Sequence, residues 1–435
     1  MNKKAEFLGS AVLLAFLLFP GRALSAQTGG EGPDGTRDRL AVKIAVMGPG
    51  DELYFWWGHI ALVIEDRITG KSLFYDYGIF SFDNENFFLN FALGRLLYSC
   101  GVSPAERNYQ GYIRTNRDIF IYTLDLPAEV KEEVRRFAEI NVLPENRDYY
   151  YHHFRDNCAT RIRDILDLAT GGQFKERFGQ APGRYTLRQH VRRHTWFSPF
   201  FDWLLNFFMG QGIDLPVTIW EEMFLPGEIG ARIRDFRYID PAGKERQLVS
   251  AAETLNRAVN RPAVLDVPRR QWPRELLLGL LIAGVSAGLL LRDRGKPGFP
   301  RFCLGLIQSC LGLFFGLAGT VLFFMTFFTN HDYTYHNSNI LYINFLLLGA
   351  VPLGIILAFA KNEKKRLSAA RLLRALWTYV FLGGILTMVL KLFPGFYQQN
   401  QVTQALVLPF ALVLSYIPFW GKALFKALGS RGEKV

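Results

Sequence analysis

One stretch decides the fold and function that we infer for this chain, namely Phe154-Arg155-Asp156-Asn157-Cys158-Ala159-Thr160-Arg161-Ile162-Arg163-Asp164. It reads as a short polar turn that runs into an apolar pattern of helical spacing, formed by Ala159, Ile162, Ile165, Leu166 and Ala169. Asp156 or Asn157 can cap this helix, because a short polar side chain accepts the free amides of the first turn. Cys158 therefore lies at the helix N-terminus, where the helix dipole favours a thiolate over a thiol. The pattern predicts a candidate nucleophile, which needs a base.

The best candidate base is His59, in the upstream run Tyr54-Phe55-Trp56-Trp57-Gly58-His59-Ile60-Ala61-Leu62-Val63-Ile64. His59 opens an aliphatic segment that is typical of a buried strand. The alternative must be kept, since a lone Cys is more often a small buried hydrophobe and a lone His beside aromatics is more often a core residue. His152 and His153 are rival bases, but they lie too near Cys158 in sequence to converge on it from a separate element.

Asp76 is the candidate third member of the site. Residues 72–78 return as a second strand after a turn near Ile68, and this hairpin brings Asp76 roughly opposite the His59 end. A carboxylate in that place would hold one tautomer of the imidazole, as the third group of a triad does. The alternative is an Asp at the edge of a turn with no part in chemistry.

These pieces of sequence resemble the Lnb N-terminal periplasmic domain family, whose members are similar to a circularly permuted papain-like thiol fold of the NlpC/P60 or lecithin–retinol acyltransferase type. A helix-start Cys facing a strand-borne His is the papain-like arrangement, here with His before Cys. The family's membrane part is matched by His331, Asn337 and Asn339 between two apolar spans, although this chain has a second histidine, His336, in the same loop. The matching pieces of the exported part are Trp57-Gly58-His59, Tyr75-Asp76-Tyr77-Gly78, Pro144-Glu145-Asn146 with Tyr149 and Tyr151, and Asp156 to Arg161 with Arg163-Asp164.

The resemblance implies a set of site residues without a metal or a cofactor. The catalytic residues would be Cys158, His59 and Asp76. The substrate-binding or supporting residues would be Trp57, Gly58, Tyr77, Asn157, Arg161, His331, Asn337 and Asn339. The polar loop 329–339 that holds the last three could cover the site or bind a head group, but capping by Asn337 or Asn339 would explain part of it as well.

Composition indicates a membrane protein. Half of the 435 residues are hydrophobic and 38 are Phe. The net charge of +11 does not indicate nucleic acid, because residues 27–275 are nearly balanced, with 32 Lys and Arg against 34 Asp and Glu. Four Cys without a C-x-x-C pair argue against a disulfide framework and against zinc. Cys100 could in principle pair with Cys158, but we expect a free thiol.

The chain divides into an exported part and a membrane part. Lys3 and Lys4, an apolar core and the small residues 23–26 predict a secretory signal, with a retained first membrane helix as the alternative. The predicted divisions are a signal peptide at 1–26, a permuted papain-like thiol domain of the α+β class at 40–170, a periplasmic accessory helical region at 171–270, an all-α bundle of five transmembrane helices at 275–421 and a basic tail at 422–435. In the accessory region, the arginines and histidines of 184–194 could hold lipid phosphates, but a solvated helix face is our expectation.

Five apolar spans approach the ~20 residues that cross a bilayer. They are predicted at 276–291, 302–328, 340–360, 375–390 and 402–420. The intervening segments 292–301, 361–374 and 422–434 are strongly basic, whereas 329–339 has no Lys or Arg. The positive-inside rule therefore predicts a multi-pass protein of the inner membrane, with a periplasmic Cys158 domain and a cytoplasmic C-terminus.

The expected function is acyl transfer at the membrane. The named member of the resembling family is a lipoprotein N-acyltransferase of Bacteroides type, which implies a membrane phospholipid as acyl donor, a Cys158 thioester, and the N-terminal amine of a lipoprotein as acceptor. The alternatives are a papain-like amidase or peptidase acting on the cell wall or on protein, and a non-catalytic membrane assembly or sensor module. The sequence leaves the oligomeric state open.

Overall fold

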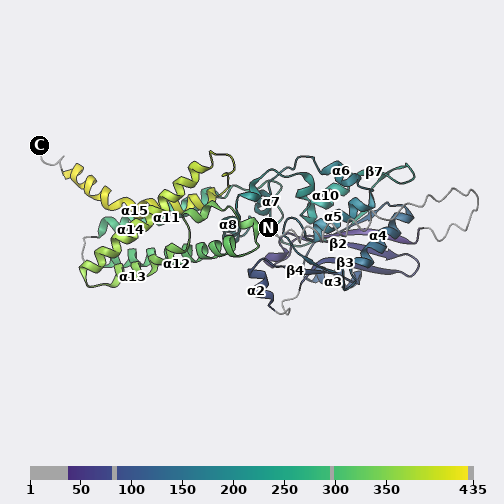
Figure 1. Ribbon diagram of the computed structural model, residues 1–435, viewed down its shortest axis with the longest axis horizontal. Coiled ribbons are helices and arrows are strands. Elements are labelled where there is room, and N and C mark those ends of the chain that lie inside the picture. Colours follow the sequence, from purple (N-terminus) through teal and green to yellow (C-terminus); the bar gives the residue numbers. More distant parts are fainter. Residues whose placement is uncertain (1–37, 81–85, 294–297, 430–435) are drawn as a thin grey trace, which may run out of the picture. The chain divides into compact units, whose positions relative to one another are not determined.

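The computed structural model describes residues 38–80, 86–293 and 298–429, with only the backbone course given for 416–429. The signal peptide expected at 1–26 lies outside the described residues. The same is true of the side chains of the basic tail. From Leu40 onward the chain contains a sheet domain with its surrounding helices, followed by a region of long apolar helices (Figure 1).

An antiparallel sheet of seven strands organises the described N-terminal part, in the order β6-β4-β3-β2-β1-β5-β9. The sequence predicts the central hairpin correctly, because Asp66 to Lys71 forms a tight turn between β2 and β3. A separate pair of short strands follows the accessory helices. The strands are β1 (Leu40–Met47), β2 (His59–Asp66), β3 (Lys71–Ile79), β4 (Leu97–Pro104), β5 (Ile119–Leu124), β6 (Asp148–Tyr150), β7 (Arg237–Ile239), β8 (Glu245–Gln247) and β9 (Val249–Asn256).

The two faces of the sheet bury different side chains, because successive residues of a strand point to opposite sides. Ile60 and Leu62 of β2 face a large core beneath α4 (Ala128–Asn141) and α5 (Cys158–Ala169). Ala61 and Val63 face a smaller core beneath α3 (Ala105–Arg114). The central strands are therefore covered on both sides, which explains why β2 reads as a continuous apolar run.

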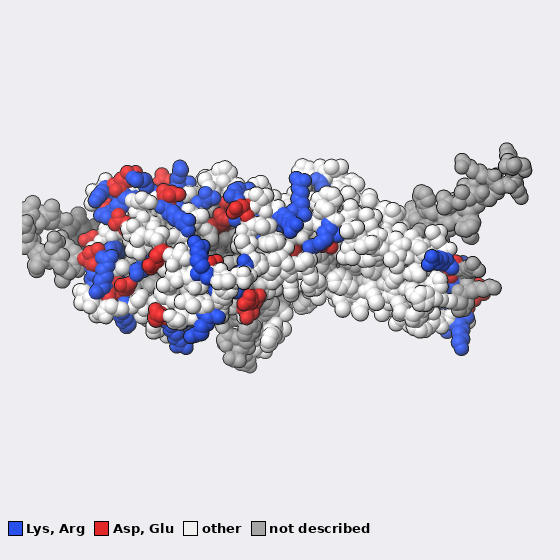
Figure 2. All heavy atoms as spheres, turned by 180° about the vertical axis from the view of Figure 1, so that it is seen from behind, with Lys and Arg blue, Asp and Glu red and all other residues white. Residues whose placement is uncertain are grey.

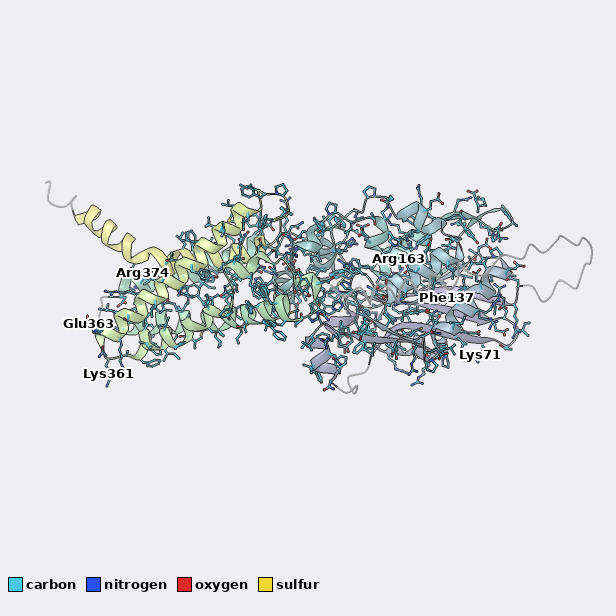
Figure 3. The ribbon with its side chains drawn as sticks, in the orientation of Figure 1. Lys71, Phe137, Arg163, Lys361, Glu363 and Arg374 are labelled. Carbon is cyan, nitrogen blue, oxygen red and sulfur yellow. The ribbon has the colours of Figure 1, made fainter. Side chains whose placement is uncertain are left out.

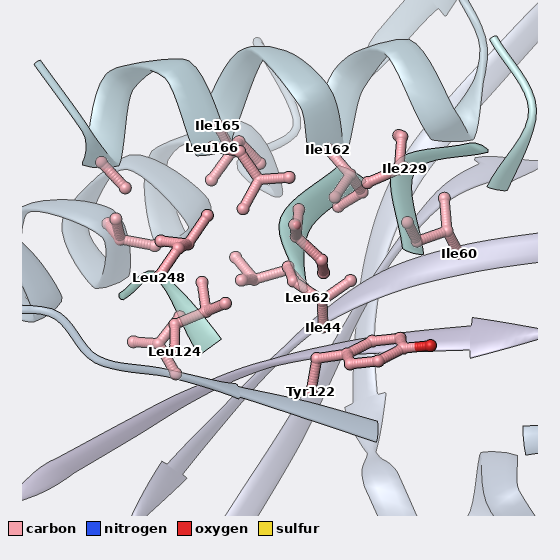
Figure 4. Packing of buried hydrophobic residues seen from close by; sticks show 14 of the residues in the cluster. Ile44, Ile60, Leu62, Tyr122, Leu124, Ile162, Ile165, Leu166, Ile229 and Leu248 are labelled. Carbon is pink, nitrogen blue, oxygen red and sulfur yellow. The ribbon is translucent and has the colours of Figure 1, made fainter. Parts of the chain in front are cut away.

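Helix α5 carries the organising stretch and is held to the sheet by its apolar stripe. Ile162, Ile165 and Leu166 lie over Ile60 and Leu62 (Figure 4). All five side chains are almost inaccessible to solvent. Truncating one of them to Ala would cost about 2–5 kcal/mol, the usual range for a large buried aliphatic side chain. This packing fixes the position of the helix start, where Cys158 lies.

The accessory region expected to be helical at 171–270 is helical only as far as Ile233, because its C-terminal part forms β7, β8 and β9. Its arginines also differ from our expectation. The expected solvated face is wrong for α7, since Arg188 and Arg193 are buried. Arg188 donates to Asp214 at 2.7 Å and to three backbone carbonyls, so its charge is paired inside the protein. The helices are α6 (Gln173–Phe178), α7 (Leu187–Thr195), α8 (Pro199–Phe208), α9 (Ile219–Glu222) and α10 (Pro226–Ile233).

Three helices in the described part of the chain are long and apolar enough to cross a membrane. They are α11 (Trp272–Arg292), α12 (Phe299–Phe328) and α14 (Glu363–Leu390). Two shorter apolar segments accompany them, at Phe345–Phe359 and Gln401–Ser415. Figure 2 shows few charged side chains on the visible face of these helices between their ends. Such a surface suits hydrocarbon better than water.

The span expected at 340–360 is not one continuous helix. Helix α13 (Ala350–Phe359) is preceded by two 3-10 turns, η4 (Ser338–Leu341) and η5 (Phe345–Gly349). Asn337 and Asn344 accept backbone amides at the starts of these turns, at 3.0 Å each. Asparagine side chains therefore cap the backbone here, whereas the number of apolar residues alone predicts one unbroken helix.

The two loops that lack basic residues meet at one end of the bundle. Ser338 donates to Gln398, and the amide of Asn400 donates to Asn339 at 2.9 Å. The charged side chains Lys361 and Arg374 lie at the other end (Figure 3). The bundle thus separates its basic loops from its neutral ones, as the positive-inside pattern requires.

Candidate active site

His59 and Asp76 form a direct pair on neighbouring strands. His59 is the first residue of β2, and Asp76 of β3 pairs with Ala61, two residues further along β2. His59 Nε2 donates to Asp76 Oδ1 at 2.7 Å. Only 15% of the His59 side chain and 20% of the Asp76 side chain are exposed. The hairpin therefore orients the imidazole and leaves Nδ1 without a hydrogen bond to any described residue.

Gly58 makes the entry into His59 possible. Its φ of +81° is disfavoured for residues with a side chain, and an added Cβ would lie 2.7 Å from the carbonyl oxygen of Met47. The preceding Trp57 packs in a separate small core, with its ring 5.8 Å from that of His194. These two residues shape the turn before the strand and make no hydrogen bond to the described side chains of His59, Asp76 or Cys158.

Cys158 is the first residue of α5, as the sequence predicts. The cap is Asn157, whose Oδ1 accepts the amides of Ala159 and Thr160 at 2.9 and 3.0 Å. The Asn157 amide also donates to the carbonyls of His153 and Phe224, which fixes the helix start from outside. The amide of Cys158 itself has no hydrogen-bond partner among the described residues. This free donor lies beside the thiol, where an oxyanion would form in acyl chemistry.

A bulge in β3 brings the thiol against the sheet. The register between β3 and β4 shifts between Tyr77 and Ile79, so Gly78 is the extra residue. Gly78 has a φ of +108°, and a Cβ added there would lie 3.8 Å from the Cβ of Cys158. The positive φ of the bulge requires glycine, and the helix start lies in van der Waals contact with this position, two residues after Asp76. No hydrogen bond joins Cys158 to His59 directly, but the two are close enough to interact electrostatically.

The charges around His59 favour its protonated form. Burial lowers the pKa of His59, whereas Tyr112, Asp76 and Cys158 raise it, and the result lies well above the usual value. Burial also raises the pKa of Tyr112, so this phenol is neutral near pH 7. The carboxylate of Asp76 is therefore a charge that holds the proton on His59, at the distance of a direct hydrogen bond.

Tyr112 also supports the site, although no sequence pattern distinguishes it from other core residues. Its ring stacks on that of His59 at 6.3 Å, from the opposite side of the sheet to α5. The guanidinium of Arg117 lies 4.8 Å from the Tyr112 ring and donates to the carbonyl of Gly48. The sequence signal that could have indicated Tyr112 is the aromatic face of the short amphipathic helix α3. The same pattern is typical of a helix that only packs against a core.

Arg161 and Tyr77 make contacts with residues near Cys158 and stabilise the structure around it. Arg161 forms a two-pronged ion pair with Asp156 at 2.6 and 2.8 Å, and its guanidinium lies 4.3 Å from the ring centre of Tyr149. Tyr77 is buried and faces Cys100 across β3 and β4. Cys100 and Cys158 are both unpaired thiols.

The rival histidines have other contacts. His152 accepts two backbone amides at Nδ1 and donates from Nε2 to Asp332 at 2.8 Å, so both ring nitrogens are occupied. Burial lowers the pKa of His153 to about 4, and the positive charges of His152 and His331 act in the same direction. His59 is therefore the histidine whose contacts suit a partner of Cys158.

The polar loop after α12 contacts the turn before Cys158 and also the accessory helix α8. His331 Nε2 donates to the carbonyl of Phe91 at 3.0 Å, and Nδ1 accepts from the Tyr333 hydroxyl at 2.8 Å. Asn337 and Asn339 both donate to the carbonyl of Phe207. The two asparagines are buried and make no hydrogen bond to the Cys158 cluster. Their observed contacts are structural.

The residues described here include no group of three or more His, Cys, Asp or Glu arranged to hold a metal ion. The features that the structure does bring together are a helix-start thiol, a free amide beside it, and an oriented His–Asp pair. They lie in a mixed α+β domain that precedes a region of apolar helices.

This combination defines a class of protein, namely a membrane protein with a sheet domain that carries a Cys–His–Asp cluster. Residues 36–193 match the family described as the Lnb N-terminal periplasmic domain. The match includes His59, Asp76 and Cys158 and ends within α7. Comparisons with curated proteins and with solved structures gave no match. The chain is thus a membrane protein with a periplasmic N-terminal domain.

Proposed function

We propose that this chain is a membrane-bound thiol acyltransferase. It would move a fatty acyl chain from a phospholipid, through a Cys158 thioester, to the N-terminal amine of a lipoprotein. The observation that carries the proposal is the bulge at Gly78, which places Cys158 against β3 two residues after Asp76, with the amide of Cys158 free among the described residues. The His-before-Cys order on an antiparallel sheet supports a permuted papain-like domain.

The first half-reaction uses all three side chains. The Cys158 thiolate attacks the carbonyl carbon of a phospholipid ester, and the Cys158 amide stabilises the oxyanion. The carbon–oxygen bond to the glycerol then breaks, and the departing alkoxide takes the proton of the His59 imidazolium. The products are a thioester on Cys158, a lysophospholipid and a neutral His59. Asp76 holds the imidazole in place throughout.

The second half-reaction returns the site to its starting state. The unprotonated N-terminal amine of the acceptor attacks the thioester carbonyl, and His59 takes a proton from the nitrogen. The carbon–sulfur bond breaks, which gives an amide, a Cys158 thiolate and an imidazolium. An N-terminal amine has a reference pKa of about 7.7–8.0, so part of it is a nucleophile near neutral pH.

The membrane region suits this reaction because donor and acceptor are both anchored in a bilayer. We propose that the short segment 345–359 and helix α15 (Gln401–Gly429) also cross it, which gives five spans. A 29-residue helix such as α15 is about 43 Å long, more than the hydrocarbon thickness. The basic loops and the C-terminus would then be cytoplasmic, in the inner membrane.

The test is covalent labelling of the full-length protein in lipid vesicles. We expect radiolabelled phospholipid to leave a hydroxylamine-sensitive acyl group on Cys158, and Cys158→Ala to take none. A diacylglyceryl peptide with a free N-terminus should discharge the label, and the same peptide with a blocked amine should not. Rapid release of free fatty acid without peptide would indicate a phospholipase instead. Cleavage of a peptide or cell-wall amide without lipid labelling would indicate an amidase, and no chemistry at all would indicate an assembly or sensor module.

A further inference from the structure

A cavity of about 460 Å³ lies between α2 (Phe87–Ala92) and the start of β4. Its volume is within the range of sites that bind small molecules. Apolar side chains make up most of the wall, and Arg95, Arg147 and Asn90 supply donors. A wall of this composition suits an amphiphile, whose tail avoids water and whose head is anionic.

The charge of the cavity favours an anion. Two arginines line it against one carboxylate, Asp148. Asp148 is already engaged, because it accepts from Ser99 at 2.5 Å and lies 3.7 Å from Arg147. Arg95 makes no side-chain hydrogen bond or ion pair with any described residue. A phosphate between Arg95 and Arg147 would accept charge-assisted hydrogen bonds from planar guanidinium groups.

Helix α2 is fixed to the outer end of a membrane span. The amide of Asn330, two residues after α12, donates to the carbonyl of Leu93 at 2.9 Å. His331 donates to the carbonyl of Phe91. Gly94 permits this approach, since an added Cβ would lie 2.9 Å from the backbone of Asn330 and His331. The helix therefore cannot lie far from the bilayer surface.

The exposed side chains of α2 continue the apolar surface of that span. Leu89 is 58% exposed and Phe91 is 47% exposed, while Phe327 and Phe328 at the end of α12 are 61% and 62% exposed. Apolar side chains of this kind lie at the boundary between head groups and acyl chains. Because the exposed apolar surface of α2 continues onto α12, a helix long and apolar enough to cross a membrane, the partner that α2 contacts is a lipid surface.

The cavity also adjoins the catalytic cluster. Ile79, which lines the cavity, directly follows Gly78, and its Cδ1 occupies the space above Gly101, the strand partner of Asp76. Phe80, another lining residue, has its ring 5.1 Å from that of Tyr98. The cavity is therefore on the sheet face that carries Asp76, with Ile79 as the wall between.

We infer that α2 and this cavity form a phospholipid-binding site at the membrane surface. Leu89 and Phe91 would enter the outer head-group region, and Arg95 and Arg147 would hold the lipid phosphate. An ester linkage of the same lipid would then reach Cys158 past Ile79. This last step rests on the proposed function, whereas lipid binding does not.

The test measures lipid contact without catalysis. Full-length Cys158→Ala protein in vesicles would be irradiated with a phosphatidylglycerol that carries a photoreactive group near the ester. We expect cross-links in residues 86–100, and at least a fivefold loss of them in Arg95→Gln/Arg147→Gln. The control Arg107→Gln/Arg136→Gln removes the same charge from exposed positions outside the cavity and should retain labelling. Leu89→Glu should weaken labelling, and Ile140→Glu, at an apolar position that is 51% exposed, should not. Thermal unfolding would verify that each variant is folded.

The outcomes separate this site from the proposed function. Cross-links found only outside 86–100 and the other residues that line the cavity, or equal labelling in the cavity and control variants, would overturn the site. If the lipid labels the cavity while the wild-type protein never forms an acyl-Cys158, the site stands and the acyltransferase proposal fails. If acyl-Cys158 forms at the normal rate in Arg95→Gln/Arg147→Gln, the reaction stands and the cavity does not deliver its acyl donor. A diacylglycerol probe without phosphate should label less than phosphatidylglycerol, because the two arginines would lack their anion.

Discussion

A hydrogen bond of 2.8 Å from His152 Nε2 to Asp332 Oδ1 joins the turn before Cys158 to the loop after α12. Arg155 adds an ion pair to the same carboxylate at 3.2 Å. This carboxylate therefore links the membrane region to the turn before the site, beside the ring contacts that Tyr333 makes with His152 and Phe154. Burial raises the pKa of Asp332, but the hydrogen bond from His152 and the charges of His152 and Arg155 lower it by a larger amount. The pKa of Asp332 is therefore below its usual value.

Asp332→Asn should destabilise the protein by about 1 kcal/mol, since the pair is partly exposed and solvent weakens it. Because the folded pKa is depressed, the stabilisation is present above pH 4 and is lost as the pH falls through the folded pKa. Thermal unfolding at pH 7 and below pH 4 would measure this. The control Glu133→Gln alters an exposed carboxylate and should change nothing. An equal effect of Asp332→Asn at both pH values would contradict the linkage.

Cys158→Ala and His59→Ala should each reduce acyl transfer at least a thousandfold while membrane insertion is unchanged. Nucleophile and base act as one unit, so the double variant should be no worse than either single variant. Single-turnover rates in vesicles would measure the three losses. A multiplicative loss in the double variant would show that His59 is not the partner of Cys158.

Asp76→Asn should retain the contact to His59 but remove its negative charge. The pKa of His59 would then fall, because Asp76 is among the groups that raise it. The alkaline limb of kcat/KM, where the imidazolium loses its proton, should move to lower pH, and the maximal rate should drop at least tenfold. A pH profile of kcat/KM tests this, and an unchanged alkaline limb would refute the electrostatic role of Asp76.

Gly78→Ala should lose activity beyond its effect on stability. The added methyl group would strain a backbone with a φ of +108°, and relief of that strain would shift the bulge, whose added Cβ would lie only 3.8 Å from the Cβ of Cys158. Gly243→Ala is a matched control, because Gly243 also has a positive φ, +80°, but nothing lies within 4 Å of its added Cβ. Both variants should be destabilised by about 1 kcal/mol or more. If Gly78→Ala and Gly243→Ala have equal acyl-transfer rates, Gly78 has no specific role in positioning the Cys158 thiol.

Topology provides a separate prediction. A reporter fused after Lys364 should be cytoplasmic, and one inserted near Tyr333 should be exported, because basic loops remain inside. Protease protection and an export-dependent reporter enzyme would measure the two positions. The reverse result would put Cys158 in the cytoplasm and remove the lipoprotein acceptor from the proposal.

The sequence by itself determined the elements of the candidate site. Local patterns predicted the start of α5 at Cys158, the strand that begins at His59 and the return strand with Asp76, and the structure confirms these elements. Such features depend on neighbours in the chain, namely an Asn cap, an apolar stripe and a tight turn. The match of residues 36–193 to the Lnb N-terminal periplasmic domain confirms the resemblance read from the same motifs.

Only the tertiary structure decided how the elements meet. The bulge at Gly78, the stacking of Tyr112 on His59 and the bond from His152 to Asp332 join residues that no local pattern relates. The burial of Arg188 was also invisible in sequence, because its partners come from other elements and a charged run resembles a solvated face. Long-range pairing depends on which surfaces pack together, and packing is decided by the whole fold. Local propensity specifies helices and strands, but it leaves the distance between Cys158 and His59 undetermined.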